Sequence, residues 1–326
     1  LSFTNLTDYV SQHGHQVELK NLDDSGWTLT DPKSQELLKK IQKAGIPLGE
    51  YVEGKIFYGI KTGLNKAFVI DEATRQKLIQ EDPKSAELIK PFLVGRDIKR
   101  YQSPDNRGKY LILIPNGWTN QQSGNIKNKW QWFKEQYPTL ARHFAPFEEE
   151  GQTRWDKGEY WWELRTCDYY EDFEKPKILY PEICGKPEFT LDNSSYYTNN
   201  KSFLISINDK YLLGILNSKL NLFLFEQMLP KLRGGFFMPA SVVLREFPIR
   251  TINFSDPADK ARYDKMVTLV ERMLALHKQR ADVKTDHEKN LIERQIEVTD
   301  KQIDALVYEL YGLTKEEIRI VEGAGK

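Results

Sequence analysis

Three short segments combine basic side chains with glycines, a composition suited to contacting a phosphate backbone. The first runs from Lys55 to Lys66 (KIFYGIKTGLNK) and contains lysines but no acidic residue. Glycine lets the backbone approach a phosphate closely, and Lys, Thr and Asn supply hydrogen bonds to phosphates and base edges. The candidate contacts in this segment are Lys61, Thr62, Asn65 and Lys66. An ordinary strand–turn–strand would have the same composition, so both interpretations stay open.

The second segment, 96–109, contains several basic residues and only two aspartates, and the third, 231–245, contains Lys-Leu-Arg-Gly-Gly and no acid. Arginine is the favoured bidentate partner of guanine in the major groove. The candidate contacts are Arg96, Lys99 and Arg100 in the second segment, and Lys231 and Arg233 in the third. A solvated loop and a charged turn are the respective alternatives.

Two adjacent asparagines, Asn199 and Asn200, precede Lys201 where a loop enters a predicted strand. Asparagine can form paired hydrogen bonds with adenine, although an Asn-Asn pair also favours turns. Tryptophans are frequent between residues 126 and 175, and such rings can stack on unpaired bases. For these tryptophans, which are Trp130, Trp132, Trp155, Trp161 and Trp162, we expect packing in the core instead.

Familiar catalytic motifs are absent from the sequence. It contains no Gly-x-Gly-x-x-Gly or Walker loop, no Gly-x-Ser-x-Gly, no His-Glu-x-x-His, and no Asn-Pro-Pro-aromatic tetrad of the kind that DNA adenine methyltransferases use. Glu182 and Lys186 resemble part of a nuclease metal site, but Cys184 stands where a second acidic ligand is needed. Lys186 is also a candidate DNA contact. We therefore expect no catalytic residue and no metal site, with a divergent nuclease as the alternative.

Composition indicates a folded protein. The chain has 326 residues, of which 40% are hydrophobic and 29% charged, and its formal net charge is zero. A surface for a polyanion must therefore be a local patch. Cys167 and Cys184 form no Cys-x-x-Cys pair, which disfavours zinc and is compatible with a reducing cytoplasm. No apolar run approaches the length of a membrane span, and no signal peptide is evident. The start at Leu1 suggests a piece of a longer protein.

The elements that must position these residues alternate between strands and helices. Strands are expected at 46–62, 109–115, 177–183 and 201–207, and helices at 35–44, 127–144 and 210–229. Asp256 before Pro257, and Thr285 with Glu288, are typical of helix starts. From Pro257 onward, apolar residues follow helical and then heptad spacing, with Ile303 and Leu306 among the heptad positions, which predicts two antiparallel helices. We therefore expect a linker at 1–34, a recognition domain at 35–254, and a helical segment at 255–326 that serves as a spacer or docking surface.

Several phrases of the sequence resemble one known family. IFYGIKTGLNKAFVID, LIKPFLVGRDIKRY, KGEYWWELRTCDYYEDFEKPKILYPEI, LLGILNSKL and LRGGFFMPASVVLREFPI occur in the order found in TaqI-like C-terminal specificity domains of restriction–modification enzymes. The resemblance covers about residues 35–322. It implies an α/β (α+β) target-recognition fold with a curled mixed sheet. The Gly59–Lys66 turn matches the family best, followed by the Lys231–Phe237 turn and Arg96–Arg100.

That family implies a DNA-recognition role without chemistry of its own. The expected partners are double-stranded DNA and a covalently linked upstream adenine-N6 methyltransferase domain, which would bind S-adenosylmethionine; no cofactor is expected in this chain. A bacterial or archaeal cytoplasm is the expected location. Besides the nuclease, the remaining alternative is a protein-docking module of a restriction–modification complex.

Overall fold

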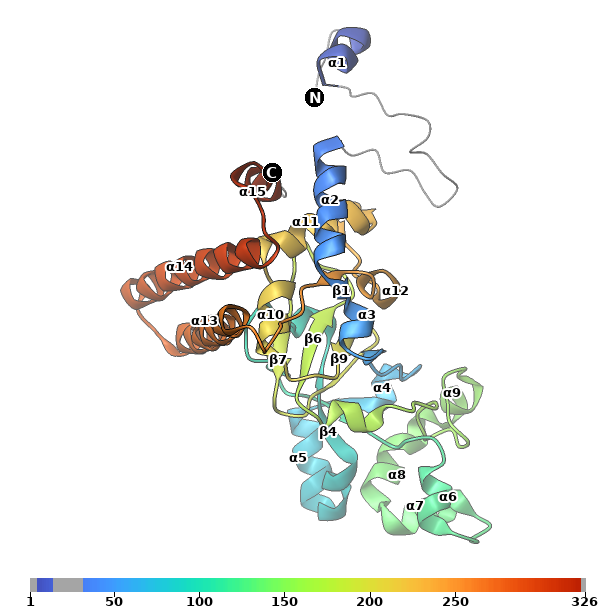
Figure 1. Ribbon diagram of the computed structural model, residues 1–326. Helices are drawn as coiled ribbons and strands as arrows, with labels where there is room; N and C mark the ends of the chain where they lie inside the picture. Colours follow the sequence, from blue (N-terminus) through green and yellow to red (C-terminus); the bar gives the residue numbers. More distant parts are fainter. Residues whose placement is uncertain (1–4, 14–31, 324–326) are drawn as a thin grey trace.

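A four-stranded antiparallel sheet occupies the centre of the molecule. The computed structural model describes residues 5–13 and 32–323, so most of the predicted linker at 1–34 lies outside the described residues. The sheet has the order β2-β9-β6-β7 and comprises β2 (Ile56–Tyr58), β9 (Ser202–Ile205), β6 (Lys177–Pro181) and β7 (Thr190–Asp192). Every residue of β6 is buried, because the strand lies at the centre of the molecule and its side chains belong to both hydrophobic clusters (Figure 1).

A second four-stranded sheet has the order β3-β5-β4-β8 and is mixed, because β4 and β8 run parallel. Its strands are β3 (Val69–Asp71), β5 (Lys109–Ile112), β4 (Ile89–Leu93) and β8 (Tyr197–Thr198). The prediction of a mixed α/β fold is confirmed. Besides the two four-stranded sheets, the described residues form two short strand pairs, β1 (Ile46–Pro47) with β12 (Pro248–Ile249) and β10 (Lys231–Leu232) with β11 (Phe236–Phe237).

The two sheets meet where the chain crosses from β8 to β9. Ile60 forms an isolated bridge with Asn199, and the Gly59 amide donates to the Ser202 carbonyl. A Cβ atom on Gly59 would lie only 1.9 Å from the backbone carbonyl oxygen of Asn199, so only glycine permits this approach. The crossing segment 199–201 is thereby fixed against the end of β2.

Helices pack on each sheet through separate hydrophobic clusters. The second sheet is covered by helices whose aromatic residues fill its core, with Phe68, Phe92, Phe133 and Phe144 fully enclosed. These helices are α4 (Asn65–Phe68), α5 (Glu72–Glu81), α6 (Trp118–Ser123), α7 (Lys129–Gln136), α8 (Pro138–Phe144) and α9 (Glu148–Thr153). The helix predicted at 127–144 is divided between α7 and α8 because Pro138 begins a new helix.

The first sheet packs against α10 (Lys210–Leu216) and α11 (Lys219–Met228), which join the N-terminal and C-terminal helices in one cluster. The remaining helices are α1 (Leu6–His13), α2 (Pro32–Ala44), α3 (Leu48–Tyr51), α12 (Ser241–Leu244), α13 (Pro257–Asp282), α14 (Asp286–Leu310) and α15 (Lys315–Gly323). Short 3₁₀ turns occur at Pro83–Leu88, Gly95–Asp97, Ala145–Phe147 and Tyr170–Phe173.

The predicted C-terminal helices form and lie side by side (Figure 1). The side chain of Asp256 caps α13, and Thr285 caps α14 together with Glu288, as the sequence predicts. The heptad residues Ile303 and Leu306 are buried in the cluster that also contains α10. The helical pair therefore shares its core with the preceding sheet. Among the described residues, no helix is both long and apolar enough to cross a membrane.

Candidate functional site

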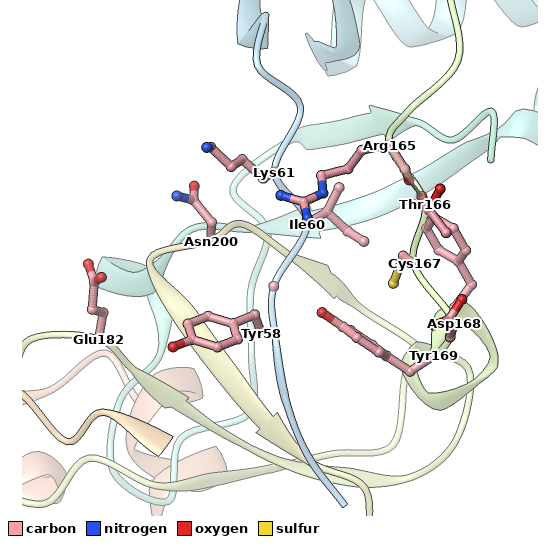
Figure 2. A pocket seen from close by; sticks show the side chains of 12 residues that line it. Tyr58, Ile60, Lys61, Arg165, Thr166, Cys167, Asp168, Tyr169, Glu182 and Asn200 are labelled. Carbon is pink, nitrogen blue, oxygen red and sulfur yellow. Dashed lines mark hydrogen bonds between the residues drawn. The ribbon is translucent and has the colours of Figure 1, made fainter. Parts of the chain in front are cut away.

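A hollow of about 500 Å³ opens where the two sheets meet. Two of the sequence candidates, Lys61 and Asn200, line it (Figure 2). The remaining lining residues come from the end of β2, from Glu182 after β6, and from the loop at 165–170. Figure 2 shows Tyr58 and Tyr169 on opposite sides of the chain that leads to Ile60. The hollow therefore combines aromatic faces with cationic and amide groups, the kinds of side chain that contact nucleotides.

One carboxylate holds two cations at the rim of this hollow. The Lys61 ammonium lies 3.0 Å from Asp156 Oδ2, and the Arg165 guanidinium lies 3.3 Å from Asp156 Oδ1. The side chains of Lys61 and Arg165 are 51% and 54% exposed, whereas that of Asp156 is 10% exposed. Because a single negative charge faces two positive ones, the cluster has an excess positive charge directed toward solvent.

The loop that carries Lys61 rests on a buried arginine. The guanidinium of Arg154 donates to the backbone carbonyls of Thr62, Asp156, Trp161 and Glu163, and it lies over the Phe68 ring. Burial lowers the pKa of Arg154 to about 10. Four carbonyl acceptors bind the two terminal nitrogens of the guanidinium, which pairs with no described carboxylate, and its buried Nε has no hydrogen-bond partner among the described residues. Nothing in the sequence distinguished Arg154 from other basic residues, so its structural role was not predicted.

The two asparagines differ in their roles. The Asn199 side-chain oxygen accepts from the amides of Gly95 and Lys201, both at 3.2 Å, so it stabilises the crossing between the sheets. Asn200 instead uses its backbone amide to donate to the Ile60 carbonyl, and its side chain lines the hollow. Of the two asparagines, only Asn200 has a side-chain amide that would face a ligand in the first hollow.

A second hollow of about 370 Å³ adjoins the first and shares Glu182 with it. Arg96, Lys99 and Lys201 all line it. Lys201 pairs with Glu182 at 2.9 Å, and Lys99 pairs with Glu188 at 3.2 Å. Arg96 is exposed and forms no ion pair with any described residue. The fold thus brings candidates from the segments at 61, 96–99 and 200–201 to one surface.

The hairpin β10–β11 borders the second hollow through Phe236, which is 46% exposed. Gly234 and Gly235 have positive φ angles of +86° and +79°, which a tight hairpin turn requires. Lys231 and Arg233 are exposed on this hairpin, and neither pairs with an acidic residue in the described part of the chain. The hairpin therefore adds unpaired cations beside the hollow.

The structure does not bring the remaining candidates to these hollows. Thr62 is only 2% exposed and donates to the Asn65 side chain, so both residues shape the start of α4. Lys66 pairs with Glu150. Arg100 binds Asp300, and Lys186 lines a separate hollow beside α14. These residues remain predictions as DNA contacts. The side chains of Thr62 and Asn65 already bond to each other within the fold.

Two thiols and one phenol at the hollows, Cys167, Cys184 and Tyr169, are protonated at neutral pH. Burial raises the pKa of the Cys167 thiol, and it raises that of Cys184 to about 12. Burial also raises the pKa of Tyr169 to about 12. These groups supply neutral hydrogen-bonding surfaces, since a thiol with a raised pKa is a poor nucleophile.

The residues of the nuclease alternative lie apart. Glu182 is paired with Lys201, whereas Lys186 lines the hollow beside α14. Within residues 5–13 and 32–323, no three His, Cys, Asp or Glu side chains are grouped closely enough to hold a metal ion. No observation of the described residues favours metal-dependent cleavage at Glu182.

Comparison with known proteins defines the class of domain. Residues 90–249 match the family of TaqI-like C-terminal specificity domains. This range includes Arg96, Asn200 and the β10–β11 hairpin. The chain therefore carries a TaqI-like specificity domain, as the resemblance predicted.

The known proteins similar to most of the chain include two curated proteins and a solved structure. It is 23% identical over 309 residues to the type II methyltransferase M.BstVI of Geobacillus stearothermophilus, covering 92% of this chain and 47% of that protein. It is 22% identical to the type II restriction enzyme and methyltransferase RM.Eco57I of Escherichia coli, covering 91% of this chain and 32% of that protein.

The solved structure is that of the type IIL restriction-modification enzyme MmeI in complex with DNA. It matches with a TM-score of 0.57 and 13% identity, over 83% of this chain and 35% of that chain, which shows a shared fold. The chain spans about half or less of the length of each of these proteins.

Proposed function

We propose that this chain is a DNA target-recognition domain that binds a duplex over the two adjoining hollows and the β10–β11 hairpin. The observation that carries the proposal is the convergence of Lys61, Arg96 and Asn200 on one surface, although they are far apart in sequence. The match of residues 90–249 to a specificity-domain family supports the same role.

The arrangement divides naturally into phosphate and base contacts. Arg96 and Arg233 are unpaired cations that would neutralise phosphates, whereas the Asn200 amide offers both a donor and an acceptor to a base edge. Lys61 would exchange its contact with Asp156 for a phosphate, and Arg165 would remain to pair with that carboxylate. The surface therefore can bind a polyanion without leaving a buried charge unpaired.

Binding by the chain to duplexes selected from a random-sequence pool tests the proposal. We expect measurable affinity. For each phosphate contacted, the logarithm of the association constant should fall by about 0.9 for each tenfold rise in salt concentration. Lys61→Ala and Arg233→Ala should each weaken binding, and Lys278→Ala should not, because Lys278 is an exposed lysine on α13 that lines neither hollow. Unchanged binding by both variants at low salt would rule out this surface.

We propose further that the domain directs a linked adenine-N6 methyltransferase domain, which would hold S-adenosylmethionine. The support is that M.BstVI and RM.Eco57I, both named as methyltransferases, are much longer than this chain. Replacing the matching part of M.BstVI with this chain tests the idea. A changed methylated sequence is expected, and an active chimera that methylates the original sequence would contradict it.

A further inference from the structure

The side chain of Trp155 is 95% exposed, the most exposed of the large hydrophobic side chains in the described residues. The other tryptophans at 126–175 contribute to the core of the second sheet, as expected. Trp161 and Trp162 are buried there, and Trp130 and Trp132 are packed against the same hydrophobic cluster. Trp155 departs from that expectation. A fully solvated indole stabilises nothing in the fold, since burial is what makes a large aromatic side chain stabilising.

The residues on both sides of Trp155 are anchored. Arg154 and Asp156 are each only 8% exposed. Arg154 binds several backbone carbonyls, and Asp156 binds Lys61 and Arg165. The loop then continues into a bridge between Lys157 and Leu164. The indole is therefore presented to solvent by a backbone fixed at both ends, and it cannot turn inward without breaking these contacts.

The surroundings of Trp155 connect it to the proposed DNA surface. Its neighbour Asp156 joins Lys61 and Arg165, and these two cations line the same hollow as Asn200. Lys157 adds an exposed ammonium on the other side. Acidic residues are also near in the chain, at Glu150 and Glu159, and Glu150 is paired with Lys66. An exposed aromatic ring beside cations is the combination that proteins use to stack on a nucleobase while contacting its phosphates.

We infer that Trp155 stacks on a nucleobase of the bound DNA and that Lys61 holds an adjoining phosphate, while Arg165 remains paired with Asp156. The inference rests on the proposed function, because it requires a duplex over the first hollow. It adds a residue that neither the sequence candidates nor the family match singled out. Because the backbone on both sides of Trp155 is already anchored, binding would restrict the rotation of the indole but would not have to order the loop.

Binding and fluorescence of the same variants test the inference. Duplexes are first selected from a random-sequence pool with the wild-type chain. On these, Trp155→Ala should weaken binding by about 5- to 150-fold, the range for loss of one base–aromatic stack, and Trp155→Phe should retain most of the affinity. Phe254→Ala is the matched control, because Phe254 is also exposed, at 62%, but lies in the segment that precedes α13.

Acrylamide quenching supplies a readout that a merely structural role would not change. Among the described tryptophans only Trp155 is exposed, so the difference in quenching between wild type and Trp155→Phe reports on it. DNA should protect this component from acrylamide. The inference would be overturned if Trp155→Ala binds DNA with wild-type affinity, or if the indole stays fully quenchable in the complex. Both results are expected if the ring docks on a protein domain instead of on DNA. Absence of wild-type binding would instead contradict the proposed function itself.

Discussion

Arg100 and Asp300 are joined by two hydrogen bonds of 2.7 and 2.6 Å, which connect the loop after β4 to helix α14. The same guanidinium donates to the backbone carbonyl of Asn217, through Nη2 at 2.7 Å and through Nε at 3.2 Å. The side chains of Arg100 and Asp300 are 20% and 29% exposed. This planar, charge-assisted contact attaches the C-terminal helices to the part of the chain that carries the hollows.

Arg100→Ala should therefore reduce stability rather than act mainly on DNA binding. We expect a loss of about 1–3 kcal/mol, because the half-buried Asp300 carboxylate and the Asn217 carbonyl both lose their partner. Urea unfolding of Arg100→Ala, Asp300→Ala and the double variant measures the coupling. Strictly additive losses would show that the two residues do not act together.

The basic pattern of the sequence predicted where cations occur but not which of them are free. Arg96 and Arg100 belong to one basic run, yet the first is unpaired while the second meets an aspartate 200 positions away. Such a partner comes from tertiary packing and has no local signal. The same limit applies to Asn199 and Asn200. The side chain of Asn199 is held inside the fold because the Gly95 amide, which is distant in sequence, donates to it.

Gly59→Ala should disrupt the junction between the sheets. The new methyl group would lie 1.9 Å from the Asn199 oxygen, so the backbone must move. We expect a loss of about 1–3 kcal/mol or more in urea unfolding, the cost typical of overpacking. Gly185→Ala is a suitable control, because the nearest atom to its Cβ would be 4.0 Å away. Equal stability of the two variants would contradict this account of the junction.

Asp304 should make stability depend on pH. Burial raises its pKa from 3.8 to about 6, against the opposing effect of a hydrogen bond from the Lys219 amide. The folded state therefore binds more protons than the unfolded state between about pH 4 and 6, and stability from this group is lost as the pH rises through that window. Asp304→Asn removes the titration and should be more stable than wild type at pH 7, by roughly 1–3 kcal/mol.

Comparison with the wild type at each pH isolates this effect from other groups, among them His277, whose pKa burial lowers to about 4. The advantage of Asp304→Asn should be small at pH 4 and grow toward pH 7. Asp264→Asn serves as the control, since that side chain is 56% exposed. A constant difference between Asp304→Asn and wild type across this range would show that Asp304 does not titrate as described.

Local signals predicted the elements better than the site. Capping residues and heptad spacing located α13 and α14, because these patterns depend on neighbours in the chain. The exposure of Trp155 was not predictable, since the neighbouring Arg154 is anchored in part by the backbone carbonyl of Thr62, 92 positions away. Thr62 was chosen for its hydroxyl, and the fold instead buries that group to begin α4.

Asn200 and Lys61 line one hollow, but their variants should affect DNA recognition in different ways. Lys61 offers a point charge, so Lys61→Ala should weaken binding to all duplexes alike and reduce the salt slope by about one phosphate. Asn200 offers paired hydrogen bonds, so Asn200→Ala should cost about 1–3 kcal/mol on the selected sequence and little on others, which relaxes specificity at one base pair. Repeating the selection with each variant separates the two roles. If Asn200→Ala weakens binding equally for all duplexes, its side-chain amide contacts the sugar–phosphate backbone of the DNA, because the strength of a contact with a base edge must depend on which base is present.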